Sequence, residues 1–214
     1  MFTWLAVATP AWGGLPAHLE IRPVAATAEV LARFERWQRV TGQATSLPAC
    51  QPLEIPEVQL CFRVWEGRRR RWVTLSDLAT WGTSGADLRE AVVEDCAGSL
   101  RALQRQTVAG STASYLTLTD GDGRATSGIL CPTLLAKRVS ALGLRVGSGF
   151  RAALPTQDVL LVWPAGDPEL DRILAVAARE IHEQQRHALT PQIMHYDGDR
   201  WRLFGRAVLR SETE

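Results

Sequence analysis

The 214-residue sequence predicts an α+β fold with a mixed, largely antiparallel sheet and helices packed on it. Segments of helical period alternate with pairs of short extended segments, so that helix–strand–strand units recur three times after a first hairpin. Turn signals rather than helices join several of the strands. Strict strand–helix–strand alternation, which is typical of a doubly wound parallel sheet, is absent from the pattern.

Composition indicates a chain that folds without a metal or a disulfide framework. It is 46% hydrophobic and 22% charged, and 24 basic against 23 acidic residues leave a net charge of +1. A chain of this length buries roughly 70% of the surface that its unfolded form exposes. A net charge near zero argues against nonspecific binding to nucleic acid or anionic lipid, but leaves room for a local basic contact.

Cysteine usage predicts a reducing compartment. The four cysteines, Cys50, Cys61, Cys96 and Cys131, lie far apart and form no CxxC pair, so we interpret them as thiols rather than as metal ligands. The segment before Arg22 has no basic residue, whereas a secretory signal begins with a basic region. We therefore expect a cytoplasmic protein with no metal, no cofactor and no membrane span.

The N-terminal quarter predicts one helix followed by a long connection. Apolar residues recur at helical spacing over Thr27–Val40, with Val40 at the end of the apolar stripe. Three prolines exclude a helix over Thr41–Pro56. We expect residues 1–55 to be a helical and loop segment, with the option of a separate lobe, and residues 56–210 to form the α+β domain.

A hairpin with a basic tip opens that domain. Apolar residues alternate over Val58–Val64, and Trp72, Val73 and Leu75 are typical of the returning strand. Four consecutive arginines lie at or near the tip: Arg68, Arg69, Arg70 and Arg71. They are candidates for binding a phosphate or an acidic partner, although solvated charges that protect a sheet edge explain them as well.

Further helices and strands are predicted after the hairpin. Ser84 and Asp87 form a capping box for a helix that we extend to Gln106. A later helix begins with Asp167 as N-cap and Pro168 in its first turn. The others are a strand at Tyr115–Leu118, a short strand at Ile129–Leu130, a helix at Pro132–Gly143, two extended runs at Phe150–Leu154 and Asp158–Trp163, and a hairpin at Ile193–Phe204.

Two segments partly match known cofactor or metal-binding motifs, but each lacks residues or a context that its motif requires. The run Asp120–Ala125 begins like a calcium loop but has arginine and alanine at positions that need a ligand and a glycine. Gly147–Ala152 matches GxGxxA, yet a strand follows it instead of the helix that a dinucleotide site requires. We therefore expect no nucleotide or calcium site here.

Asp158 and His195 are the two candidate catalytic residues. Asp158 opens an apolar strand, where a carboxylate must be paired or hydrogen-bonded. Either its carboxylate accepts backbone N–H bonds across the turn at Pro155, or it has a ligand-binding or catalytic role. His195 alternates with Ile193 on a strand and lines either a cleft or the sheet rim. Joint catalysis requires the two side chains to lie within about 10 Å of each other.

Several short motifs resemble the YtpQ-like family of bacterial cytosolic proteins of unknown function. They are Gln106–Thr112, Asp120-Gly121, Ala125-Thr126, Ile129-Leu130 and Pro155–Leu160, within a match over about residues 92–204. This chain has Trp163-Pro164 where the family usually has an acidic residue. The resemblance supplies no mechanism, but implies that Thr107, Gly110 and Asp158 are the positions to test.

The leading hypothesis is therefore a non-catalytic protein that binds a protein partner or a small ligand. Its binding residues would be the arginines of the hairpin tip and a groove near Thr107, Gly110 and Asp158. One alternative is a hydrolase or phosphoryl-handling enzyme that uses Asp158 with His195. A weaker alternative is a nucleic-acid accessory protein that uses the Arg68–Arg71 hairpin with nearby tryptophans. The sequence leaves the oligomeric state open.

Overall fold

The computed structural model describes residues 19–25, 32, 35–36, 39–40, 48–53, 55, 57–66, 69–90, 98, 100–120, 125–185 and 188–206. Most of the helix predicted over Thr27–Val40 lies outside these residues, but the five described positions within it are helical. Val40 is 80% exposed, so the expectation that it belongs to a buried stripe is wrong.

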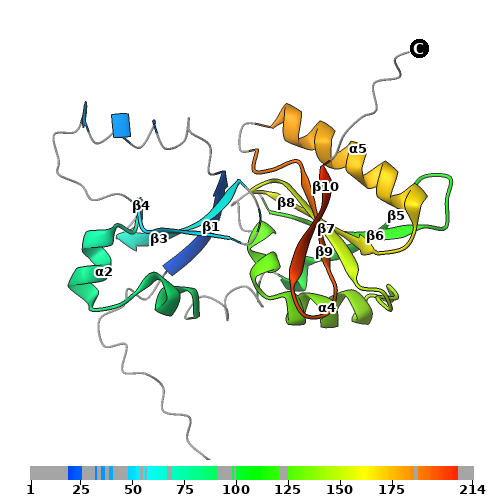
Figure 1. The fold of residues 1–214 in the computed structure, drawn as a ribbon, viewed down its shortest axis with the longest axis horizontal. Helices are drawn as coiled ribbons and strands as arrows, with labels where there is room; N and C mark the ends of the chain where they lie inside the picture. The colour runs from blue at the N-terminus through cyan, green and yellow to red at the C-terminus, as the bar shows by residue number, and fades with distance from the viewer. Residues whose placement is uncertain are drawn as a thin grey trace, which may run out of the picture.

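Two antiparallel sheets make up the framework (Figure 1). In the four-stranded sheet, the long β3 pairs with β1 on one side and with both β2 and β4 on the other. Its strands are β1 (Leu19–Ala25), β2 (Cys50–Pro52), β3 (Val58–Glu66) and β4 (Arg69–Trp72).

The larger sheet has six strands in the order β10-β9-β7-β8-β6-β5, and every neighbouring pair is antiparallel. Its strands are β5 (Gln104–Thr107), β6 (Ser114–Thr119), β7 (Phe150–Thr156), β8 (Val159–Pro164), β9 (Gln192–Tyr196) and β10 (Trp201–Arg206). The expected α+β class with a largely antiparallel sheet is confirmed.

Helices cover both faces of the six-stranded sheet, with α5 on one side and α4 on the other (Figure 1). The α-helices are α2 (Leu75–Trp81), α4 (Pro132–Ala141) and α5 (Pro168–Gln184), and the 3₁₀ helices are η1 (Leu100–Ala102) and η2 (Ala125–Leu130). Asp167 caps α5 by accepting from the N–H groups of Glu169 and Leu170, as predicted.

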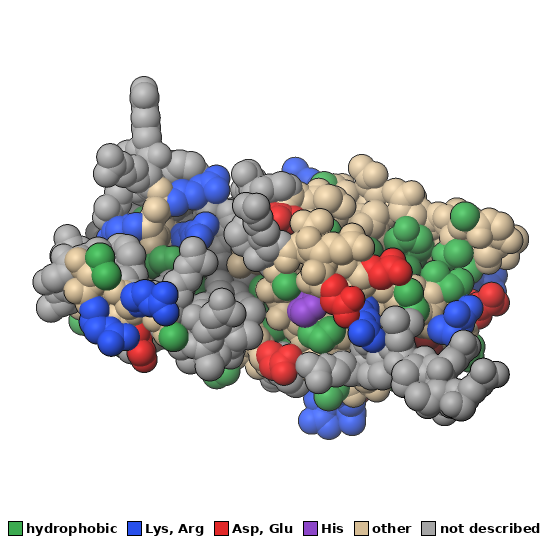
Figure 2. Space-filling model, turned by 90° about the horizontal axis from the view of Figure 1, so that it is seen from above, with side chains coloured by type: hydrophobic (Ala, Val, Ile, Leu, Met, Phe, Trp, Pro, Cys, Tyr) green, Lys and Arg blue, Asp and Glu red, His purple; other side chains and the backbone are tan. Residues whose placement is uncertain are grey.

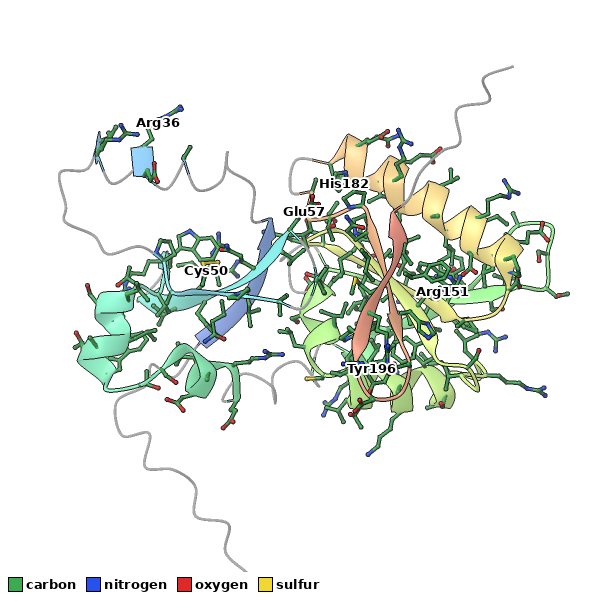
Figure 3. All side chains as sticks on the ribbon, in the orientation of Figure 1. Arg36, Cys50, Glu57, Arg151, His182 and Tyr196 are labelled. Carbon is green, nitrogen blue, oxygen red and sulfur yellow. A yellow bond between two sulfur atoms is a disulfide. The ribbon has the colours of Figure 1, made fainter. Side chains whose placement is uncertain are left out.

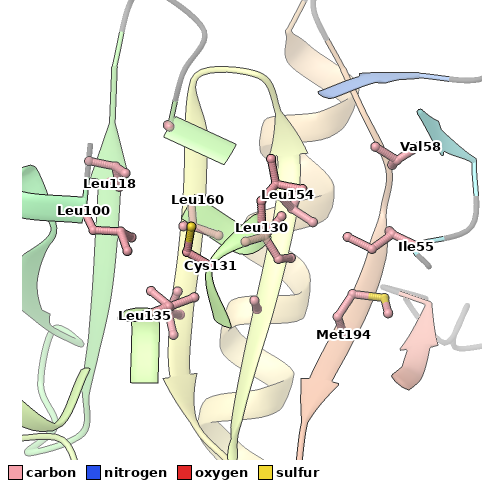
Figure 4. Packing of buried hydrophobic residues seen from close by; sticks show 14 of the residues in the cluster. Ile55, Val58, Leu100, Leu118, Leu130, Cys131, Leu135, Leu154, Leu160 and Met194 are labelled. Atoms are coloured by element: carbon pink, nitrogen blue, oxygen red, sulfur yellow. The ribbon is translucent and has the colours of Figure 1, made fainter. Parts of the chain in front are cut away.

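Two clusters of buried side chains hold these layers together. Under α5, Trp163 and Ile193 contact Leu170 and Leu174 within the smaller cluster. The larger cluster joins α4 and the opposite sheet face to the four-stranded sheet. Its members at the junction include Ile55, Val58 and Met194, which lie close together in Figure 4. Because β1 and β2 both pair with β3, the predicted boundary at residue 55 falls inside one sheet.

Several predicted elements differ from the structure. Strands β1 and β2 lie within residues 1–55, where only a helix and loops were expected. Leu75 begins α2 instead of ending a strand, because Thr74 caps the helix. The segment Ile129–Leu130 belongs to η2 and not to a strand. The helix predicted to reach Gln106 is wrong at its C-terminal end, where η1 and β5 follow. Strand β5 has no apolar alternation because it lies at the sheet edge, where both of its faces meet solvent.

Candidate functional site

The structure places the predicted binding residues in separate parts of the fold. Among the four arginines, Arg71 lies in β4 and makes two hydrogen bonds to Asp77, at 2.6 and 3.0 Å. Asp77 is also the residue that completes the capping box of α2 with Thr74. Burial raises the pKa of Asp77, but hydrogen bonds from Arg71 and Thr74 outweigh burial and hold it below its usual range. Arg71 therefore supports the fold.

The rest of the arginine cluster is only partly described. Arg70 is exposed in β4 and pairs across the hairpin with Trp65. Arg68 and the side chain of Arg69 lie outside the described residues. The structure therefore supplies no geometry for a four-arginine binding site.

Thr107 is the last residue of β5, and Gly110 lies in the turn that joins β5 to β6. Val108 donates a backbone hydrogen bond to Ala113 across this turn at 2.9 Å. Gly110 is exposed with a φ of +74°, a conformation that favours glycine. The glycine of this motif is therefore explained by turn geometry.

Asp158 lies in the turn between β7 and β8, where its backbone carries the contacts. Its N–H donates to the Thr156 hydroxyl at 3.2 Å, and its carbonyl accepts from the N–H of Asp120 at 3.0 Å. Asp158 therefore lies beside the end of β6, whereas Thr107 pairs with Ser114 at its beginning. Five residues of strand separate these two points by about 17 Å, so no single groove joins them.

The structure does not bring Asp158 and His195 together. His195 pairs with Arg151 at the start of β7, while Asp158 follows Thr156 at the end of that strand. The five residue steps from Arg151 to Thr156 span about 17 Å, beyond the reach of a shared proton transfer. The enzyme hypothesis that rests on this pair therefore lacks the geometry it requires.

His195 instead belongs to a row of polar side chains on the sheet face that α5 covers. It lies between Arg151 of β7 and Arg202 of β10 in the strand register. Burial lowers the pKa of His195, and Arg151 and Arg202 lower it further, whereas Asp197 opposes them. Burial and the two arginines therefore favour the neutral form of the His195 imidazole.

Arg151, labelled in Figure 3, is buried in this row and held from two sides. It forms an ion pair with Asp171 of α5, and its guanidinium lies 3.4 Å from the centre of the Phe204 ring. Asp171 also accepts a hydrogen bond from the indole of Trp163 at 2.7 Å. These contacts fasten α5 to the sheet and give Arg151 a structural role.

Within the described residues, an open groove between η1 and α4 is a candidate binding site. We call it the α4 groove; it is lined by Leu100, Arg101, Leu134, Lys137, Arg138 and Ala141. The four residues from α4 are spaced by three, four and seven positions, so they form one stripe along the helix. Leu134 is 38% exposed and contributes apolar surface to the groove. The groove thus combines apolar surface with three cations.

Two basic side chains at or near this groove are held by hydrogen bonds to backbone carbonyls. Arg138 donates to the carbonyl of Arg101 at 3.1 Å and so joins α4 to η1. Arg105 donates to the carbonyl of Leu142, the C-cap of α4, at 3.4 Å. Cations at a helix C-terminus are favoured by the helix dipole. Positive charge is therefore concentrated along α4, since neither η1 nor α4 contains an aspartate or a glutamate.

Sequence reasoning missed this groove, although a signal was available. Residues 97–157 contain seven basic residues and two acidic ones, Asp120 and Asp122, in a chain whose net charge is only +1. On the face that carries α5, by contrast, acidic and basic side chains are mixed over the six-stranded sheet (Figure 2). The excess of basic residues in this region, which the net charge of the whole chain hides, indicates that the α4 side of the molecule is basic.

A disulfide joins Cys50 of β2 to Cys61 of β3 (Figure 3). The interpretation of these two residues as thiols is wrong, because the strand register places them directly opposite each other. Disulfides persist in oxidising surroundings, so the cysteines no longer support the predicted cytoplasmic localisation. Cys131 is a free, buried thiol.

Within the described part of the chain, every helix is too short or too polar to cross a bilayer. The same residues contain no group of three or more His, Cys, Asp or Glu side chains arranged to hold a metal ion. Comparison with known proteins found no matching family model, curated protein or solved structure. The resemblance to the YtpQ-like family therefore stays a prediction.

Proposed function

We propose that this protein is a non-catalytic binding protein that docks an acidic, amphipathic helical segment of a partner protein in the α4 groove. The single observation that carries the proposal is the composition of that groove, in which Arg101, Lys137 and Arg138 surround exposed apolar surface at helical spacing. Helix-in-groove recognition uses apolar anchors at this spacing, flanked by charges that select the partner.

The shape of the groove favours a protein segment over a small molecule. Small-molecule sites enclose most of the ligand surface, whereas this groove is open along α4. Its lining also lacks an aromatic side chain on which a nucleobase could stack. An acidic helix satisfies both the apolar floor and the cations.

Two other predictions stay proposals beside this one. Membership of the YtpQ-like family rests on the motifs of the second half of the chain and carries no activity with it. Cytoplasmic residence stays a prediction, and the Cys50–Cys61 disulfide weighs against it.

A binding titration tests the function. The probe is a fluorescein-labelled helical peptide with leucines at i, i+3, i+4 and i+7 and glutamates beside them, compared with the same peptide carrying lysines. We expect the acidic peptide alone to raise the fluorescence anisotropy, with an affinity that falls as salt is added. Equal binding of both peptides, or no binding of the acidic one at about 1 mM, would contradict the proposal.

Matched variants locate the site. Arg101→Ser with Lys137→Ser should weaken binding about tenfold, because two exposed ion pairs are lost. Arg172→Ser with Arg200→Ser removes the same charge from exposed positions elsewhere and should leave binding unchanged. An equal loss in both double variants would show nonspecific attraction. Preferred binding of a single-stranded DNA probe would instead favour the nucleic-acid alternative.

A further inference from the structure

Strand β10 forms one edge of the six-stranded sheet, and within the described residues its only strand neighbour is β9. The hairpin register shows which of its backbone groups point outward. Asp197 donates a backbone hydrogen bond to Arg200 at the turn, so hydrogen-bonded pairs alternate from there along the strands. His195–Arg202 is the next hydrogen-bonded pair, which leaves the N–H and C=O of Leu203 directed away from β9.

The side chains of this edge are unusually apolar. Leu203 and Phe204 are 52% and 50% exposed, and they follow each other in the strand. The opposite edge, β5, consists of Gln104-Arg105-Gln106-Thr107 and is polar. Natural proteins usually protect exposed edges with charges, so an edge with two exposed large apolar residues points to a binding role.

Charge at this edge identifies the kind of occupant. Arg151, His195 and Arg202 lie side by side on successive strands. Arg151 is buried and paired with Asp171 of α5, so Arg202 is the cation of this row that lies at the edge. Arg202 pairs with Asp197 at 2.6 Å but is more than half exposed. A second copy pairing β10 with β10 would add another arginine to this row, whereas an acidic residue there forms a favourable cross-strand pair.

We propose that the β10 edge binds an extended segment of a partner protein that alternates apolar and acidic residues and adds to the sheet as a seventh strand. The partner backbone bonds to the outward N–H and C=O of Leu203, and its apolar side chains contact Leu203 on one face of the sheet. Its acidic side chains face Arg202 on the other face, beside Phe204, whose ring lies over Arg151. The bulge at Leu203–Gly205 limits the added strand to a short one.

The test uses a labelled eight-residue peptide of alternating valine and glutamate. Two comparison peptides carry lysine in place of glutamate or a central proline that cannot complete the ladder. We expect binding of the glutamate peptide only. Leu203→Pro removes the outward N–H without breaking a bond to β9, and should weaken binding at least about tenfold.

Thr107→Pro is the matched control at the other edge. Val108 and Ala113 are hydrogen-bonded across the β5–β6 turn, so the N–H of Thr107 also points outward. This variant should bind the peptide like the unmodified protein, and circular dichroism should show that both proline variants stay folded. If Leu203→Pro unfolds the protein, Leu203→Lys gives the same test through the side chain.

Three results would overturn the inference. They are equal binding of all three peptides, no binding of the glutamate peptide at about 1 mM, and a dimer in light scattering that Leu203→Pro converts to a monomer. The last would identify a second copy as the occupant. The Arg101→Ser, Lys137→Ser variant should bind this peptide normally, so the β10 edge and the α4 groove are tested separately.

Discussion

The guanidinium of Arg138 donates a hydrogen bond to the carbonyl oxygen of Arg101, across the line where α4 meets η1. This contact fixes one wall of the α4 groove against the other and places their cations on the same surface. A surface whose charges are held in place loses less side-chain entropy on binding than one made of free side chains. The fold therefore prepares the α4 groove for a partner.

The disulfide gives the first prediction. Reduction, or Cys50→Ser with Cys61→Ser, should lower the free energy of unfolding by about 3 kcal/mol, because the bond closes a short loop in the unfolded chain. Urea denaturation with and without reductant measures this change. The double variant is the control, since reductant should not alter its midpoint. A reductant effect of equal size in the variant would show that Cys50–Cys61 is not the bond responsible.

The ion pair between Arg71 and Asp77 gives the second prediction. Asp77→Ala removes both the α2 capping box and the partner of Arg71, and should cost about 1–2 kcal/mol. Asp87→Ala is a matched control, because Asp87 makes the same capping bonds with Ser84 and no arginine of the described residues pairs with it. Urea midpoints should fall further for Asp77→Ala. Equal losses would mean that Arg71 adds nothing to stability.

His195 gives a prediction about pH. Its pKa in the folded protein lies below the usual value near 6.5, so the unfolded chain binds the proton more tightly. Stability should therefore fall as the pH drops below about 6.5, and His195→Asn should reduce that fall. Urea midpoints at about pH 7.5 and 5.5 measure it for both proteins. The same loss in both would exclude His195 as the responsible group.

The sequence predicted those elements that short local patterns mark, such as an alternating strand or a capped helix. The alternation over Val58–Val64 is buried in β3, and Asp167 caps α5 as its sequence indicates. Gly149 explains the rejected glycine motif, since a side chain there would collide with the carbonyl oxygen of Tyr196. Edge strands such as β5 carry no such signal, because neither face is buried.

Contacts between distant residues could not be predicted in the same way. Cys50 and Cys61 become partners only when the short β2 pairs with β3, and nothing in their spacing indicates that pairing. Likewise, His195 faces Arg151 through strand register and lies far from Asp158 for the same reason. Predicting the α4 groove would have required both the excess of basic residues over residues 97–157 and the contact between η1 and α4.

A charge exchange across the α4 groove tests the proposed function most directly. In the variant Arg101→Glu with Lys137→Glu, fluorescence anisotropy should show that the acidic helical peptide no longer binds and that the lysine peptide now does. The unmodified protein should show the opposite preference in the same buffer. If the variant kept its affinity for the acidic peptide, the groove would not be the binding site, and the account of its function would be contradicted.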